Sequence, residues 1–300
     1  MKSHIKNIVS KLRYNIIVET FNALYLLRRK KQFAPKVVSI EETINKIVSE
    51  KCSVSRFGDG EILLTENHPI GFQKADKMLS KRLTEVFLSN EANHLICISD
   101  VFEDINRYNR RARRFWRTHF YLYGYIWEKL IDKKRIYYNT FITRPYMDFA
   151  SKSKSGEWFL LLQKIWEQRD IVFIEGEKSR LGVGNDLFAN THSIKRILCP
   201  PRNAFDKYNT ILSEATKLDK NSLILVALGP TATVLAYDLH KLGYQAIDIG
   251  HVDIEYEWSN MKVTHKVKIP NKFVNEQPGG DNVNSVNEEA YYNQIISKIE

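Results

Sequence analysis

Leu223-Ile-Leu-Val-Ala-Leu228, followed by Gly229-Pro-Thr231, carries the clearest indication of the fold. Six consecutive apolar residues predict a strand buried on both faces, as strands in the middle of a parallel sheet are. The glycine and proline end this strand, and the threonine is expected to cap a helix over residues 231–242. Gly243 predicts the end of that helix before a second strand at 246–249. Two strands joined through a helix indicate a parallel sheet.

Short apolar runs alternate with helical patterns over most of the remaining sequence. Helices are expected near residues 185–191 and 203–218. The other candidate strands are Ser53 to Phe57, Leu95 to Ser99, Ile171 to Glu175 and Arg196 to Cys199. This rhythm predicts an α/β protein with a Rossmann-like, mostly parallel sheet and helices on both of its faces.

One aromatic-rich segment, at about 101–168, interrupts this rhythm and predicts a helical insertion that shapes a pocket. The expected organisation is a basic helical extension at 1–40, a main domain at 41–265 that includes the insertion, and a polar tail at 266–300. Within the tail, only Glu288 to Ile299 has a helical pattern. No internal repeat is present in the sequence.

The composition is that of a globular protein. The 300 residues are 43% hydrophobic and 27% charged, which is typical of a folded chain rather than a disordered one. The three cysteines, Cys52, Cys97 and Cys199, lie far apart in apolar runs, and the sequence has no C-x-x-C pair. They are expected to be reduced core residues, which argues against structural zinc and indicates a cytoplasmic protein.

The formal net charge of +10 is unevenly spread, because residues 1–31 carry eight Lys and Arg against one acid, Glu19. The apolar residues between 16 and 27 are too few to span a bilayer, which needs about 20, and no signal-peptide cleavage site follows them. An amphipathic helix is therefore expected here. Peripheral contact with the inner face of an anionic cell membrane, packing on a partner, and simple coverage of the domain all fit this pattern.

A second basic cluster lies in the aromatic segment. Its members are Arg107, Arg110, Arg111, Arg113, Arg114 and Arg117. No helix-turn-helix, zinc-finger or RNA-binding signature accompanies it, so nucleic acid is not expected as a partner. An acidic or phosphate-bearing substrate, lipid headgroups and a solvated helix face are the interpretations that remain.

An acidic motif follows the first candidate strand, in Arg56-Phe-Gly-Asp-Gly-Glu61. Asp59 and Glu61 are hard oxygen ligands of the kind that hold Mg²⁺ or Mn²⁺ together with substrate phosphates. Gly58 and the second glycine allow the backbone to turn and to approach a ligand closely. An ordinary surface turn explains the same residues, because Asp and Gly favour turns.

A glycine-rich loop, Gly176 to Phe188, follows the candidate strand that ends at Glu175. A loop of this kind, between a strand and a helix, is where doubly wound sheets bind nucleotide phosphates. It matches neither the dinucleotide fingerprint nor the P-loop. The residues expected at the nucleotide are Arg180, as a planar fork for a pyrophosphate, with Gly182, Gly184, Asn185 and Asp186. A plain loop with an N-cap residue is the alternative.

A third group follows the strand at 246–249, in Gly250-His-Val-Asp-Ile-Glu-Tyr-Glu-Trp258. If this segment is extended, His251, Asp253, Glu255 and Glu257 share one face. That face could complete a metal site or supply a general base, whereas an exposed edge strand is the plainer interpretation. A Pro-containing turn with Arg144 and Tyr146 suits substrate positioning or an ordinary loop.

Taken together, four segments resemble those of the GT-D fold glycosyltransferases, a bacterial family met in adhesin glycosylation and surface-polysaccharide clusters. The resemblance covers residues 50 to 260, and several motifs occur in the expected order. They are Ser55-Arg-Phe-Gly-Asp-Gly-Glu61, Ile142-Thr-Arg-Pro-Tyr146, Glu175-Gly with Ser179-Arg-Leu-Gly-Val-Gly-Asn-Asp-Leu-Phe188, and Gly250-His-Val-Asp-Ile-Glu-Tyr-Glu-Trp258.

The resemblance implies a metal-dependent hexosyltransferase with a UDP-sugar donor, a glycan or glycoprotein acceptor, and Mn²⁺ or Mg²⁺ at Asp59 and Glu61. Asp253, His251 and Glu255 are then candidates for the base that accepts the proton of the acceptor hydroxyl. Contacts to the donor are expected from Arg56, Gly58, Arg180, Gly182, Gly184, Asn185, Asp186 and Thr231. A methyltransferase or other Rossmann-type nucleotide enzyme, and a non-catalytic membrane-associated scaffold, are the alternatives.

Overall fold

The computed structural model describes residues 15–27, 34–102, 104–285 and 289–300. Nine parallel strands form one sheet in the order β1-β4-β3-β2-β8-β7-β5-β6-β9. The strands are β1 (Lys36–Val37), β2 (Ser53–Phe57), β3 (His94–Ile98), β4 (Ile136–Asn139), β5 (Asp170–Gly176), β6 (Ser193–Cys199), β7 (Leu223–Ala227), β8 (Gln245–Asp248) and β9 (Ile295–Lys298). The prediction of an α/β fold with a parallel sheet and flanking helices is confirmed.

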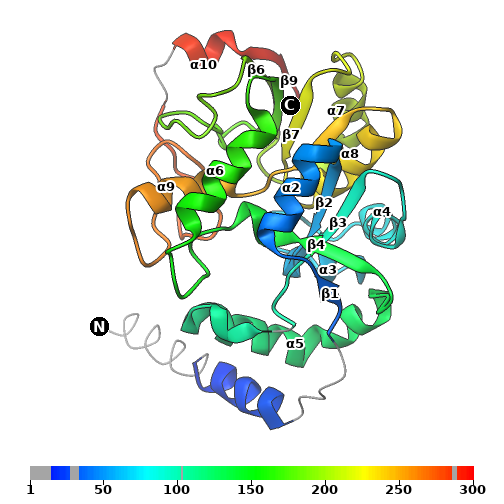
Figure 1. Ribbon diagram of the computed structural model, residues 1–300, viewed down its shortest axis with the longest axis vertical. Coiled ribbons are helices and arrows are strands. Elements are labelled where there is room, and N and C mark those ends of the chain that lie inside the picture. The colour runs from blue at the N-terminus through cyan, green and yellow to red at the C-terminus, as the bar shows by residue number, and fades with distance from the viewer. Residues whose placement is uncertain (1–14, 28–33, 103, 286–288) are drawn as a thin grey trace.

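Helices cover both faces of the sheet (Figure 1). On one face α8 (Pro230–Lys241) packs on β2 and β8 and contacts α4 (Lys77–Leu88) and α7 (Tyr208–Ala215). On the other face α2 (Ile40–Glu50) packs beside α6 (Ser155–Trp166), which also contacts α9 (Val252–Asn260). Strand β7 lies between the two layers, so its first four residues are fully buried, as its uninterrupted apolar sequence predicts.

Local sequence explains where several helices begin. Ser39 and Glu42 form a capping box at α2, whereas Asp76 caps α4. Helix α8 begins differently from the expectation, because Gly229 is its N-cap and Pro230 its first residue. Thr231 is fully buried inside the helix and caps nothing, so that prediction is wrong. Gly243 does follow the helix in a left-handed conformation, with φ of 85°.

Two segments of the candidate site differ from the predictions. Residues 185–191 form turns instead of a helix. Residues 252–260 form α9 rather than a strand, because Val252, Ile254 and Trp258 supply a helical apolar face that is buried. The alternating acidic residues are therefore divided between faces of a helix, and Asp253 shares a face with Glu257 four residues on.

The aromatic segment and the C-terminal residues each contribute a strand that the sequence did not suggest. The helix α5 (Arg110–Leu130) is followed by β4, which pairs with β3 and β1. The helix expected at the C-terminus is short, α10 (Glu289–Asn293), and gives way to β9 beside β6. Ile295 and Ile296 are β-branched, which favours a strand once a sheet edge is available.

Residues 15–27 are helical and pack on α5 (Figure 1). The rings of Phe21 and Tyr121 stack with centroids 5.1 Å apart, and Asn22 donates to the Arg114 carbonyl. Ile16, Ile17, Leu26 and Leu27 are exposed, whereas the rest of the 1–31 segment lies outside the described residues. Within the described ranges, no helix is both long and apolar enough to cross a membrane. The short helix α3 (Asp59–Thr65) follows β2 and contributes to the candidate active site.

Candidate active site

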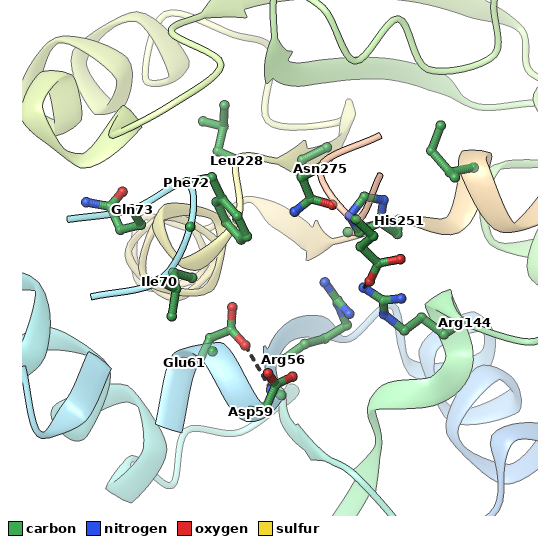
Figure 2. Close-up of a pocket in the computed structure, with 18 of the residues that line it drawn as sticks. Arg56, Asp59, Glu61, Ile70, Phe72, Gln73, Arg144, Leu228, His251 and Asn275 are labelled. Atoms are coloured by element: carbon green, nitrogen blue, oxygen red, sulfur yellow. Dashed lines mark hydrogen bonds and ion pairs between the residues drawn. The ribbon is translucent and has the colours of Figure 1, made fainter. Parts of the chain in front are cut away.

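A cavity of about 540 Å³ lies where the carboxyl ends of the strands meet. This is the edge at which parallel α/β sheets bind ligands, and the volume is within the roughly 300–1,000 Å³ usual for small-molecule sites. Its walls come from segments far apart in the sequence, including the start of α3, residues 70–73, α5, the turn after β6, and residues 266–276. Figure 2 shows part of this lining.

The acidic pair lies on the floor of the cavity (Figure 2). Asp59 is the first residue of α3, and the Glu61 carboxylate accepts a 2.9 Å hydrogen bond from the Gly58 N–H. Burial raises the pKa of Asp59, although the charge of Arg144 opposes this. Burial, together with the charge of Asp248, raises the pKa of Glu61 to about 7. For both carboxylates, the cost of burying a charge outweighs the opposing effect of the nearby arginine.

Arg56 lines the cavity, but its guanidinium is held by the protein. It donates to the Asp248 carboxylate at 2.8 Å, to the Asp248 carbonyl at 2.9 Å, and to the Thr143 hydroxyl at 2.6 Å. Gly250 lies against the same guanidinium, since a Cβ at this residue would lie 2.0 Å from Nη2 of Arg56. Arg56 therefore braces β2 against β8 beside the acidic pair.

A charged cluster occupies the opposite wall. Arg144 pairs with Glu276 at 2.9 Å, and Lys266 pairs with the same carboxylate at 3.0 Å. Although burial favours the neutral acid, the charges of Arg144, His251 and Lys266 hold the pKa of Glu276 well below its usual range. Glu276 is thus a fixed anion that ties residues 266–277, which we call the strap, to the turn containing Arg144.

The three candidate bases have different surroundings. His251 lines the cavity (Figure 2), and burial, reinforced by the charge of Arg144, lowers its pKa to about 4. Asp253 also lines the cavity, but its carboxylate pairs with Lys272 at 2.7 Å and accepts from the Gly182 N–H and Asn185. Glu255 is not in the lining and accepts from the N–H groups of Tyr146 and Met147.

Most of the glycine-rich loop lies behind the cavity wall. Gly176, Ser179 and Leu181 line the cavity. Arg180 is outside the lining, and its guanidinium donates to the carbonyls of Asn271 and Asn284, at 2.8 and 2.6 Å.

Other residues expected at the donor are also outside the lining. Asn185 donates to Asp253 and Glu257, and Asp186 accepts from Tyr256. Gly182 and Gly184 take φ values of 74° and 76° that let the loop turn. Thr231 is fully buried within α8.

Several lining residues carried no recognisable signal in the sequence. They are Phe72, Asp148, Arg202, Phe273, Asn275 and Glu276. All come from irregular segments with no periodicity, and the strap lies in the stretch expected to be a polar tail. The pairing of Glu276 with Arg144 spans more than a hundred residues, so only the folded structure reveals it.

An all-parallel sheet with an acidic pair facing a cavity at its carboxyl edge has the architecture in which open α/β folds bind ligands. The profile of the family described as "Glycosyltransferase GT-D fold" matches residues 54–277. The chain therefore belongs to the GT-D fold glycosyltransferase family.

Two curated relatives come from streptococci. The probable glycosyl transferase Gly of Streptococcus gordonii is 41% identical over 266 residues, which are 88% of this chain and 39% of that protein. Glycosyltransferase GlyD of Streptococcus pneumoniae serotype 4 is 39% identical over 265 residues, which are 88% of this chain and 32% of that protein. The chain thus spans only about a third to two fifths of the length of these relatives.

Solved structures agree with the fold. One described as domain of unknown function 1792 with a distinct glycosyltransferase fold has a TM-score of 0.85 and 41% identity, covering 94% of this chain and 99% of its own. Another, described as a new glycosyltransferase from Streptococcus sanguinis, has a TM-score of 0.85 and 39% identity, covering 89% of this chain and 100% of its own.

Proposed function

We propose that this chain is a metal-dependent hexosyltransferase that moves a sugar from a UDP-sugar to a hydroxyl of a glycan or glycoprotein, in bacterial surface-polysaccharide or adhesin glycosylation. The observation that carries the proposal is the Asp59 and Glu61 pair on the cavity floor. In the reaction, the acceptor oxygen bonds to the anomeric carbon, and the bond from that carbon to the diphosphate oxygen breaks. The electron pair leaves with UDP, and the acceptor proton passes to a base.

The donor set fits a divalent cation. The arginines whose charges act on the two acids are paired elsewhere, Arg56 with Asp248 and Arg144 with Glu276. The part of the chain that the structure describes holds no cluster of three His, Cys, Asp or Glu side chains suited to a metal. Mg²⁺ and Mn²⁺ at nucleotide sites usually take one or two carboxylates and complete their coordination with phosphates and water. Asp59 and Glu61 would hold the ion, which neutralises charge that grows on the leaving diphosphate.

The residues of the chain have distinct parts in this scheme. Gly229 lines the cavity at the N-terminus of α8, where a helix dipole favours an anion such as a diphosphate. The positive charge of Arg144 acts on Asp59, and the arginine is held in place by its pair with Glu276. Among the candidate bases, His251 suits proton acceptance best, since it faces the cavity and is neutral near pH 7. Asp253 and Glu255 already accept hydrogen bonds from the protein, and we assign them a structural role.

The test is UDP-sugar hydrolysis and transfer with and without Mn²⁺. We expect Asp59→Ala and Glu61→Ala to lower the Mn²⁺-dependent rate at least 100-fold, because both remove a cation ligand. Glu66→Gln is the matched control, since Glu66 lies at the end of the same helix outside the cavity lining. Unchanged rates in both alanine variants would refute the metal role. A thermal shift with S-adenosylmethionine but none with UDP would point to a methyltransferase instead.

Membrane contact through residues 1–31 is a second proposal, favoured by the exposed Ile16, Ile17, Leu26 and Leu27 beside a basic sequence. Such contact would hold the protein at the inner face of the cell membrane, as the membrane-associated scaffold alternative also requires. Flotation with phosphatidylserine-containing liposomes tests it. The full chain should float, and a protein lacking residues 1–31 should not; equal flotation of the two would rule the contact out.

A further inference from the structure

The cavity extends to both sides of the acidic pair, and the two sides differ in width and chemistry. In one direction, four strand spacings separate β2 from β6, through β8, β7 and β5. At about 4.8 Å per spacing this is a distance of about 19 Å. In the other direction β3 and β4 give two steps, about 10 Å. We therefore expect the extended nucleoside diphosphate on the wide side and a smaller, compact group on the narrow side.

The narrow side combines aromatic and hydroxyl groups. Trp116 and Phe115 from α5 line the cavity, with ring centroids 5.4 Å apart, and Phe141 lies after β4. Phe115 is 47% exposed although it borders the cavity. An aromatic ring offers a rigid apolar face at low entropic cost, and the C–H face of a sugar ring packs on such a surface.

Two hydroxyl groups on the same side have no partner among the residues that the structure describes. Ser99 follows β3 and Thr140 follows β4, and both residues line the cavity. Their side chains are 1% and 5% exposed, yet neither hydroxyl forms a hydrogen bond within the described ranges. A buried hydroxyl without a partner costs about 1–3 kcal/mol, so such groups usually serve a ligand or an ordered water.

We propose that Phe115, Trp116, Ser99 and Thr140 form the subsite for the terminal sugar ring of the acceptor. The inference rests on the proposed function and adds the acceptor class and the residues that recognise it. Arg111, an exposed member of the cavity wall on α5, borders the same subsite and supplies N–H donors to sugar hydroxyls. A sugar bound here lies beside Asp59 and Glu61, where the donor's anomeric carbon is expected.

The first experiment separates acceptor from donor binding. Saturation-transfer NMR measures the affinity of methyl glycosides of glucose, galactose and N-acetylglucosamine, and calorimetry measures that of UDP with Mn²⁺. Phe115→Ala should weaken glycoside binding about tenfold and change UDP affinity less than twofold. Tyr125→Ala, an equally exposed aromatic on α5 outside the cavity, is the matched control and should alter neither.

A second experiment, on the two hydroxyl groups, distinguishes a role in ligand binding from a role in stability. Ser99→Ala and Thr140→Val remove hydroxyls without breaking any hydrogen bond, so the melting temperature should stay level or rise. Glycoside affinity should nevertheless fall about three- to tenfold, the value of one hydrogen bond.

Three outcomes would overturn the subsite. They are no glycoside binding to the unaltered protein, binding of a serine-rich peptide instead, and an equal loss of UDP affinity in Phe115→Ala, which would assign this side to the donor. Failure of the unaltered protein to bind UDP at all would refute the proposed function itself, and so the two failures are distinguishable.

Discussion

Gly250 illustrates how a single residue without a side chain shapes this site. Its φ is 47°, in the left-handed region, and a Cβ would overlap the guanidinium of Arg56. Gly250→Ala must therefore displace Arg56, which leaves the buried Asp248 carboxylate without its counter-charge. We expect a loss of about 3 kcal/mol in the free energy of unfolding, measured by urea denaturation, and loss of most transferase activity.

Gly184→Ala separates this effect from backbone strain. Gly184 has φ of 76°, and among the described residues nothing beyond its chain neighbours lies within 4 Å of where an alanine methyl would sit, so only left-handed strain of about 1–2 kcal/mol applies. Equal losses in the two variants would contradict the role given to Arg56.

His94 is a buried titratable residue whose effect depends on pH. Ser55 donates to the Thr233 carbonyl, so its oxygen accepts from Nε2 of His94, and Nδ1 has no partner among the described residues. Burial, together with the charge of His240, lowers the pKa of His94 to about 3. In the unfolded chain this histidine binds a proton near pH 6.5, whereas in the folded protein it stays neutral at that pH. Stability from this residue is therefore complete above pH 6.5 and is lost as the pH falls from 6.5 toward 3.

His94→Gln tests this dependence, because glutamine keeps an N–H donor for Ser55 and cannot be protonated. Between pH 7.5 and 5.5, one such histidine accounts for about 1.4 kcal/mol of the free energy of unfolding. Urea denaturation at the two pH values should show that the variant loses about that much less than the unaltered protein. An identical loss in both would mean that His94 is not the titrating group.

At the scale of elements, a buried lysine of the strap ties the strap to α9. Lys272 is 2% exposed and pairs with Asp253 at 2.7 Å and Glu257 at 2.9 Å. Lys272→Met leaves both acids without their counter-charge, so we expect a loss of about 3 kcal/mol in urea denaturation. Lys298→Met is the control, because the exposed pair of Lys298 with Glu177 contributes about 0–1 kcal/mol. Similar losses would show that burial of the lysine is not the cause.

The same helix shows what the sequence could and could not predict. Strand β7 was predictable, because buried parallel strands have continuous apolar sequences. Alternating acidic residues in α9 fitted a strand equally well, and only packing of Trp258 decides the matter. The acidic pair was predictable from local residues, since Asp59 and Glu61 directly follow a strand. The strap was not, because it depends on contacts between distant segments such as Glu276 and Arg144.

At the scale of the whole molecule, the sheet places ligand-facing residues at its middle and short strands at its edges. Strand β1 has two residues and β9 has four, whereas β5 and β6 have seven each. Short edge strands limit unwanted pairing with other chains. The edge at β9 also shields β6, whose Ile197, Leu198 and Cys199 are buried.

Removal of residues 294–300 tests the part that β9 has in this architecture. The deletion exposes the edge of β6, removes the 2.8 Å hydrogen bond from Ile299 N–H to the Leu198 carbonyl, and takes Gln294 from Arg196. We expect the free energy of unfolding to fall by several kcal/mol, because the buried Ile299 and a full strand pairing are lost together. Size-exclusion chromatography should show association through the uncovered edge. Deletion of Glu300 alone, an 82% exposed residue, should change neither measurement. If the 1–293 chain were monomeric and as stable as the full chain, β9 would not be needed to protect the edge of β6.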